Sequence, residues 1–306
     1  MINKNISLLH KEQSQILIIK LGALGDFFRA IPIFHWIRLE HKDARITLLT
    51  SDEFVELTQS LGTVDTVIPF SRRNNKASSY NKINKSFFLH FDIVYDLQFV
   101  DRTKFYRLST LCYRLPEWHC MSSENKFISS LLFYKRTCPS ITKLSDSILN
   151  ISILAKYGIS NPFVVMAPFC SARSAWHKQW PVNYYLDVAK HIQQCGYQVV
   201  VLGSKNDEGC AQIQKSGHIH SLIGETELQD LIQLMPHASI AIGNDTGIMH
   251  LAELCQIPTI VIMSGVNDPN KAPKGPLYVR LLETPITDIS VHRVITTFDD
   301  VSRKSQ

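Results

Sequence analysis

The stretch IAIGNDTGIMHLAEL, residues 240–254, changes from an apolar strand pattern to an apolar helix pattern through GNDTG. It contains no lysine or arginine, so it offers an anion only bare backbone and the free N–H groups of a helix start. Gly247 permits a close approach to that backbone, and Asp245 can accept hydrogen bonds from sugar hydroxyls. His250 lies one turn after Thr246 on the same helix face. The stretch therefore predicts a strand, a turn and a phosphate-binding helix N-terminus.

An ordinary helix cap explains the same residues equally well. Asp245 or Thr246 is a typical N-cap residue, and His250 can simply be a packed side chain. The stretch alone does not distinguish a cap from a ligand site, so the sequence around it has to decide.

Around this stretch, the second half of the chain alternates apolar runs with helical segments. The predicted strands are FVVMAPF (163–169), QVVVLG (198–203), IHSLIG (219–224), SIAIG (239–243) and PTIVIM (258–263). The predicted helices open at 180–181, near 207, at 228 and at 246, and a last apolar stripe follows residue 288. Strands and helices in alternation predict a doubly wound parallel sheet, in which ligands bind beyond the carboxyl ends of the strands.

The first half of the chain shows the same alternation of apolar runs and helical segments. Its predicted strands are QILIIKL (15–21), RITLLT (45–50), TVIPF (66–70) and FDIVYDLQF (91–99), with an exposed loop at 71–86 and no clear pattern over 105–140. A helix over about 146–157 ends before the linker SNP. We therefore expect an α/β protein with two doubly wound Rossmann-like domains facing across a cleft, 1–158 and 159–285. The helix in 286–306 is expected to pack back toward the first domain.

Two loops after predicted strands of the second domain carry further candidates. Ser171 and Lys178 lie in APFCSARSAWHKQWP, directly before the helix that opens at Trp180-Pro181, where a lysine is well placed for a phosphate. Asp207 lies in LGSKNDE, where a carboxylate can pair with a ribose diol. The alternatives are a solvated loop lysine and an ordinary N-cap aspartate.

In the first domain, IKLGALGDFFRAIP (19–32) follows the first strand. It has neither GxGxxG nor a P-loop, so it is a weak nucleotide signal. Asp26 is a carboxylate at a glycine turn with Arg29 three residues later, and it is a candidate general base. The competing explanation is that Asp26 caps the following helix.

Composition limits the remaining classes. The chain has 306 residues, 45% of them hydrophobic, and no window approaches the roughly 18 apolar residues of a membrane span. Since no signal-like segment opens it, we expect a cytoplasmic protein. Seven cysteines without a CxxC indicate reduced thiols, and His218 and His220 lack further ligands, so no metal site is expected.

The positive charge is confined to the first half. Residues 1–150 hold 20 Lys+Arg against 14 Asp+Glu, whereas 151–306 hold 12 against 13. Such a surface suits nucleic acid, anionic lipid or a phosphorylated substrate, and charge alone does not choose among them.

The segments KLGALGD, DLQ…R, KQWP and GNDTGIMHLA together resemble glycosyltransferase family 9, the bacterial ADP-heptose:lipopolysaccharide heptosyltransferases, over almost the whole chain. The resemblance implies a GT-B fold in which 1–158 binds the acceptor and 159–285 the nucleotide sugar. It implies inverting, metal-independent transfer of a heptose or related sugar from an ADP-sugar to the lipopolysaccharide inner core. The chain contains no Asp-x-Asp, the usual magnesium-bridging pair, and no cofactor is expected.

The resemblance also implies a role for each matching residue. Asp26 matches the catalytic base and Lys178 the phosphate-binding lysine. The implied nucleotide-sugar contacts are Ser171, Asp207, Thr226, Asp245, Thr246, Gly247 and His250. The implied acceptor contacts are Arg29, Arg72, Arg73, Gln98 and Arg102. An anionic glycolipid acceptor at the cytoplasmic face of the inner membrane, with peripheral contact to its inner leaflet, would account for the basic half.

The chain departs from the family pattern at four positions, Phe99, Phe169, Cys170 and Ile248. Two alternatives therefore stay open: a nucleotide-sugar epimerase on the same fold, and a nucleotide-sugar-binding protein without catalysis. A nucleic-acid binder would explain the basic half but neither Asp26 nor the GNDTG segment, so nucleic acid is not expected as a partner.

Overall fold

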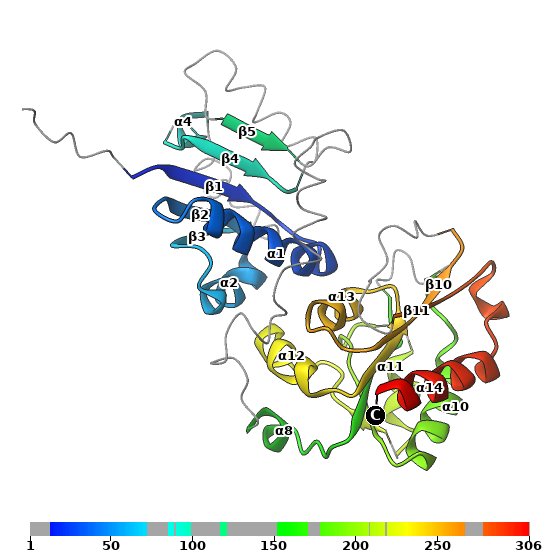
Figure 1. The fold of residues 1–306 in the computed structure, drawn as a ribbon. Coiled ribbons are helices and arrows are strands. Elements are labelled where there is room, and N and C mark those ends of the chain that lie inside the picture. The colour runs from blue at the N-terminus through cyan, green and yellow to red at the C-terminus, as the bar shows by residue number, and fades with distance from the viewer. Residues whose placement is uncertain are drawn as a thin grey trace, which may run out of the picture. The chain divides into compact units, whose positions relative to one another are not determined.

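A computed structural model describes residues 13–71, 85–88, 90–98, 117–120, 152–170, 178–207, 209–217, 219–266 and 278–305 of the chain. Contacts divide the chain into two compact units (Figure 1). The first consists of Met1–Gly22 and Ala30–Thr137, and the second of Ala23–Arg29 and Cys138–Gln306. Among the described helices, none is both long and apolar enough to cross a membrane.

The first unit contains a parallel sheet of five strands in the order β3-β2-β1-β4-β5. Its elements are β1 (Gln15–Ile19), α1 (Leu24–Glu40), β2 (Arg45–Ser51), η1 (Asp52–Phe54), α2 (Val55–Leu61), β3 (Thr66–Phe70), α4 (Lys85–Phe88), β4 (Ile93–Asp96) and β5 (Glu117–Cys120). The start of α1, up to Arg29, is grouped by its contacts with the second unit. Four of the five residues of β1 are buried, because a central parallel strand is covered on both faces. Leu17 and Ile19 pack with Phe70, Phe88 and Val94 in the core.

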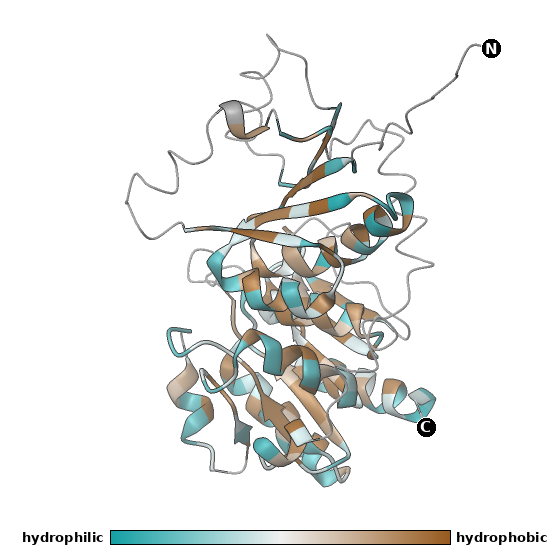
Figure 2. Cartoon of the chain, turned by 90° about the vertical axis from the view of Figure 1, so that its left-hand side faces the viewer, coloured by the Kyte–Doolittle hydropathy of each residue, from teal (hydrophilic) through white to brown (hydrophobic). Residues whose placement is uncertain are grey.

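The second unit contains a parallel sheet of six strands in the order β11-β10-β9-β6-β7-β8. Its strands are β6 (Phe163–Ala167), β7 (Gln198–Val201), β8 (His220–Ser221), β9 (Ile240–Asn244), β10 (Thr259–Ser264) and β11 (Val279–Glu283). Its helical elements are α8 (Ser152–Lys156), α10 (Val182–Gln194), α11 (Cys210–Gln214), α12 (Leu228–Leu234), η2 (Met235–His237), α13 (Gly247–Leu254), η4 (Ile286–Asp288) and α14 (Val291–Ser305). The strands are mostly apolar and the helices carry polar outer faces (Figure 2).

The C-terminal helix α14 packs its apolar face onto the core of the second unit. Its apolar stripe of Val294, Phe298 and Val301 packs with residues of α10 such as Ile192. The indole N–H of Trp180 donates to the Ile289 carbonyl oxygen over 2.8 Å, which ties down the segment before the helix. The apolar stripe of α14 is therefore buried within the second unit, and the expectation that 286–306 packs back toward the first domain stays a prediction.

The predicted α/β class with two doubly wound sheets is confirmed. Two strands were not predicted from the sequence: β5, which falls in the uninterpreted region 105–140, and β11. Of the loop predicted over 71–86, Ser71 is irregular and α4 begins at Lys85, while 72–84 lies outside the described residues.

Candidate functional site

The second sheet has one switch point, between β6 and β9. From β6 the chain adds β7 and β8 on one side, and then returns to place β9 and β10 on the other. The connections leave two neighbouring parallel strands in opposite directions there, and in sheets of this kind ligands bind beyond the carboxyl ends of those two strands, here β6 and β9. The two segments that the sequence predicts to bind an anion, the loop before Lys178 and GNDTG, follow these two strands.

Asn244 joins the two loops at the switch point. It is the last residue of β9 and is fully buried. Its Nδ2 donates to the Pro168 carbonyl oxygen over 2.6 Å, and its Oδ1 accepts from the Trp180 backbone N–H over 3.0 Å. One amide side chain therefore fixes both ends of the loop that contains Lys178. Asn244 was not among the predicted site residues, although an amide within GNDTG was the available signal.

Gly243 explains why the backbone is bare at the end of β9. A Cβ on this residue would lie 2.7 Å from the Ala167 carbonyl oxygen and 2.9 Å from the Met249 sulfur. Any side chain would push β9 away from β6 or from α13, so the first glycine of GNDTG serves close packing at the switch point.

Helix α13 begins at the switch point with an unusual cap. Thr246 is its N-cap, with extended φ −136° and ψ 170°, but its side chain makes no capping hydrogen bond. Its Oγ1 is buried and has no hydrogen-bond partner in the described part of the chain. The Met249 and His250 N–H groups donate to the Thr246 carbonyl oxygen, while the first N–H groups of a helix have no acceptor within it. A hydroxyl and free N–H groups at a positive helix end suit a phosphate.

His250 lies between two carboxylates. Its Nε2 is 3.7 Å from Oδ1 of Asp245, and its Nδ1 is 3.6 Å from Oε2 of Glu253. His250 and Glu253 are both buried. Glu253 lies on the side of the ring that faces away from Asp245. The sequence does not point to Glu253, because it falls within the apolar pattern of the helix.

The charges of three predicted site residues affect the pKa of the buried Cys170 thiol. Burial, and after it the negative charges of Asp245 and Asp207, raise the pKa of this thiol, while the positive charge of Lys178 lowers it; together they bring the pKa to about 12. These three predicted side chains are thus brought around one point of the second unit. Because the thiol stays protonated near neutral pH, Cys170 fills space and is not a nucleophile.

Asp207 follows β7 at the same edge of the sheet. Its Oδ2 accepts a hydrogen bond from the Ser204 backbone N–H over 2.6 Å. Burial raises the pKa of this carboxyl, and the hydrogen bond from Ser204 lowers it by less, so the pKa is raised overall. Helix α11 starts only at Cys210 with Gly209 as N-cap, so Asp207 is not the cap that the alternative explanation required.

Phe169, one of the departures from the family pattern, is buried beneath this loop. A Cβ on Gly203 would lie 2.5 Å from the Phe169 ring and 3.2 Å from Oδ2 of Asp207. The aromatic ring thus fills the space that the glycine leaves and supports the loop of Asp207 from below.

Thr226 lies between β8 and α12, also beyond the carboxyl end of a strand. The next residue, Glu227, forms a capping box with Asp230, whose carboxylate accepts the Glu227 N–H over 3.0 Å. Asp230 also accepts from Lys156 at 2.7 Å and from the Tyr157 hydroxyl at 2.6 Å. The start of α12 is therefore fixed by buried polar contacts next to Thr226.

The first sheet has its own switch point, between β1 and β4. Oε1 of Gln98 accepts the Leu21 backbone N–H over 2.9 Å, and the buried Lys20 ammonium donates to the Leu97 carbonyl oxygen over 3.2 Å. Gln98, predicted as an acceptor contact, thus holds the turn after β1. The sequence does not point to Lys20, because it falls within the predicted strand QILIIKL.

Asp26 lies in the first turn of α1, which begins at Leu24, so it is not the N-cap. Its carboxylate is half-exposed and lies 3.6 Å from the Arg29 guanidinium. The residue is thus accessible and carries a neighbouring positive charge. The predicted residues Ser171, Arg72, Arg73 and Arg102, and the departure Phe99, lie outside the described residues.

Two doubly wound parallel sheets, the second with a helix N-terminus at its switch point, define the GT-B class of fold. The chain belongs to glycosyltransferase family 9 (heptosyltransferase), whose sequence model matches residues 111–282, more than half of the chain. The resemblance found in the sequence is thereby confirmed.

Individual relatives agree with this family. Lipopolysaccharide heptosyltransferase 2 of Escherichia coli K12 is 30% identical over 116 residues, which cover 35% of this chain and 33% of the relative. The matched segment thus spans about a third of that curated relative's length.

Solved structures show the same fold over nearly the whole chain. The E. coli ADP-heptose lipopolysaccharide heptosyltransferase II has a TM-score of 0.72 at 17% identity, covering 95% of this chain and 99% of that one. E. coli heptosyltransferase WaaC with ADP-2-deoxy-2-fluoro heptose has a TM-score of 0.70 at 14% identity, covering 94% and 99%.

Proposed function

We propose that this protein transfers a heptose from ADP-heptose to the inner core of lipopolysaccharide. Family membership supports the reaction class, and the names of the relatives support the donor and acceptor. The observation that carries the proposal is the buried Thr246 hydroxyl, which has no hydrogen-bond partner among the described residues and caps a helix at the switch point. A buried unpaired hydroxyl is costly, so a ligand oxygen is its natural partner.

In this proposal, the diphosphate of the donor binds at the start of α13. Thr246 and the N–H of Gly247 donate to its oxygens, with His250 one turn further in. Lys178, and Ser171 in the same loop, approach from the β6 side. Asp207 accepts from the ribose hydroxyls, Thr226 lies by the adenine, and Asp245 binds hydroxyls of the sugar. The switch point of the sheet and the positive helix end support this orientation.

The proposed chemistry is a single displacement with inversion. Asp26 accepts the proton of an acceptor hydroxyl as that oxygen bonds to the anomeric carbon, while the bond to the diphosphate breaks and ADP leaves from the opposite face. Half-exposure keeps the Asp26 carboxylate accessible to a hydroxyl. Lys178 and the N–H groups of α13 neutralise the charge that grows on the leaving diphosphate. Since these groups supply that charge, the proposed reaction needs no metal.

The proposed acceptor is an anionic glycolipid, bound by Arg29, Arg72, Arg73, Gln98 and Arg102. The excess of positive charge in residues 1–150 supports this assignment. We place the protein at the cytoplasmic face of the inner membrane, in peripheral contact with anionic lipid, where such an acceptor is presented.

A transfer assay with ADP-heptose and a heptose-free lipopolysaccharide acceptor tests this function. The wild type should release ADP only with acceptor present and add one heptose to it. Asp26→Asn should bind ADP-heptose with nearly normal affinity and lose transfer. Nucleotide release without acceptor would indicate an epimerase, and binding without turnover a nucleotide-sugar-binding protein; either result would reject the proposal.

A further inference from the structure

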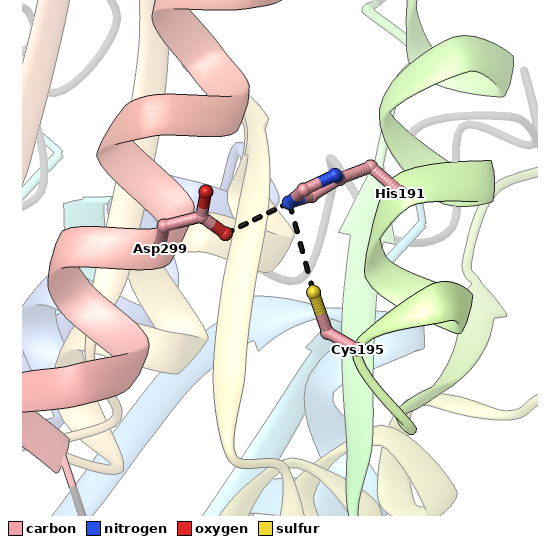
Figure 3. A group of neighbouring side chains, drawn as sticks. All are labelled: His191, Cys195 and Asp299. Carbon is pink, nitrogen blue, oxygen red and sulfur yellow. Dashed lines mark hydrogen bonds and ion pairs between the residues drawn. The ribbon is translucent and has the colours of Figure 1, made fainter.

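Three side chains on the outer helices of the second unit converge on one point (Figure 3). His191 and Cys195 come from the end of α10, four residues apart, and Asp299 comes from α14. Nε2 of His191 lies 2.8 Å from Oδ1 of Asp299 and 3.6 Å from Sγ of Cys195. The three potential ligand atoms all lie within 4.8 Å of one another.

The geometry differs from that of a catalytic Cys-His-Asp group. In such a group, the carboxylate holds one ring nitrogen and the nucleophile lies at the other. Here both Asp299 and Cys195 approach the same nitrogen, Nε2. One nitrogen carries either one proton or one lone pair, so it cannot serve as a relay between the two groups. The cluster is instead arranged like ligands around a shared centre.

We infer that His191, Cys195 and Asp299 form a binding site for a divalent transition-metal ion of the zinc type. Imidazole nitrogen, thiolate sulfur and carboxylate oxygen are the ligands that zinc binds, and three protein ligands leave a fourth tetrahedral position for water. The assignment is independent of the proposed transferase function, because none of the three residues belongs to the donor site.

The distances fit this ion. Metal–nitrogen and metal–sulfur bonds of about 2.0 and 2.3 Å at a tetrahedral angle separate the two ligand atoms by roughly 3.5 Å, and the observed Nε2–Sγ distance is 3.6 Å. On metal binding, the distance between Nε2 of His191 and Oδ1 of Asp299 must increase from 2.8 Å to roughly 3.3 Å. The side chains of His191 and Asp299 are 28% and 38% exposed, so rotation of the carboxylate can provide this movement.

The two helices hold the ligands on a rigid base. Phe298, next to Asp299, is buried and meets the His191 ring edge-on with centroids 6.3 Å apart. Tyr197, just beyond Cys195, donates to or accepts from the Ser302 hydroxyl at 2.9 Å and packs on Phe298. Because both backbones are fixed by the core, a metal ion gains a preorganised site and clamps α14 onto α10.

The site lies far from the proposed chemistry. Helix α10 starts just after Lys178 and runs for 13 residues, which is about 20 Å of helix, before Cys195. A metal ion here therefore stabilises the fold of the second unit and takes no part in sugar transfer. Its loss should leave transfer unchanged, so the two proposals fail separately.

Titration of the tag-free, reduced, full-length protein with Co²⁺ tests the site. The wild type should bind one ion with a thiolate-to-metal charge-transfer band and a tetrahedral visible spectrum, and Zn²⁺ should displace it. Cys195→Ser should abolish the charge-transfer band, and Asp299→Asn should weaken binding by at least about tenfold. Cys210→Ser, which removes a partly buried thiol of the same unit, should change neither.

Zn²⁺ should also raise the melting temperature of the wild type and of Cys210→Ser, but not of Cys195→Ser, and a chelator should reverse the shift. A wild type that shows no charge-transfer band would overturn the inference. So would a band that persists unchanged in Cys195→Ser, or one that disappears in Cys210→Ser. If Cys195→Ser fails to fold, Asp299→Asn and His191→Gln still decide the question through the affinity for Co²⁺.

Discussion

The side chain of Asn244 accepts a hydrogen bond from the backbone N–H of Trp180 over 3.0 Å, although the two residues lie 64 positions apart in the chain. The same amide donates to the Pro168 carbonyl oxygen. The loop after β6 is therefore fixed at both of its described ends by one residue of β9. The position of Lys178, two residues before Trp180, depends on this bond.

Asn244→Ala should destabilise the protein and weaken donor binding together. It leaves a buried N–H and a buried carbonyl without partners, and each unsatisfied group costs about 1–3 kcal/mol. Denaturant unfolding and calorimetric titration with ADP measure the two effects. The control is Asn183→Ala at an exposed position of α10, which should change neither. Normal ADP affinity in a destabilised Asn244→Ala protein would show that the loop does not need this anchor.

Gly243→Ala should be destabilising at a position where alanine is usually harmless. The added Cβ meets the Ala167 carbonyl oxygen at 2.7 Å, a backbone atom that can move only with β6. We expect a loss of about 1–3 kcal/mol in the free energy of unfolding, as for other overpacked sites. An unchanged unfolding midpoint would mean that the two strands separate freely, contrary to the close packing described above.

The sequence predicts most of the second sheet because buried parallel strands are continuous apolar runs, and those runs end at 169, 203, 224 and 243. It also predicts that Asp207, Asp245 and Lys178 gather, because the carboxyl ends of parallel strands share one edge. The sequence does not predict strand β11, because this half-buried edge strand includes Arg280 and therefore lacks a continuous apolar run.

Other parts of the site could not be predicted, for a different physical reason. The roles of Asn244 and Glu253 depend on which backbone groups and which ring they meet in space. A buried amide or carboxylate within an apolar segment predicts some polar partner but does not identify it. The packing of α14 on α10 could not be predicted either, because the apolar stripe of α14 could pack on any apolar surface.

Asp230→Asn should destabilise the second unit in a pH-dependent way. Burial raises the pKa of this carboxyl, but hydrogen bonds from Lys156, Tyr157 and the Glu227 backbone outweigh burial and lower it. A lowered folded-state pKa contributes stability above the unfolded value of about 3.9, and this stability is lost as the pH falls through the folded-state pKa.

The stability difference between wild type and Asp230→Asn should therefore be about 1–2 kcal/mol at pH 7 and narrow below about pH 4. Thermal unfolding across this range measures it. Asp187→Asn is the control, because its ion pair with Lys190 is exposed on both sides and contributes little. A difference that is constant across the range would assign the effect to capping geometry and not to charge.

Lys178→Ala should lower both donor affinity and transfer rate, because the proposed role is to neutralise the diphosphate. Losing one preorganised donor typically costs about 2.7–4 kcal/mol in the barrier, or roughly 100- to 1,000-fold in kcat. Lys190→Ala, on the exposed face of α10, is the matched control. Steady-state kinetics with ADP-heptose compare the two variants. A wild-type rate for Lys178→Ala would show that Lys178 does not neutralise the diphosphate.

The central claim is that the carboxyl edge of the second sheet binds the nucleotide sugar at the switch point between β6 and β9. Hydrogen exchange of the full-length protein with and without ADP tests it most directly. The account predicts slower exchange in residues 244–250 and 202–207, with little change in α14. Slower exchange confined to other segments, or no change in residues 244–250 at saturating ADP, would contradict it.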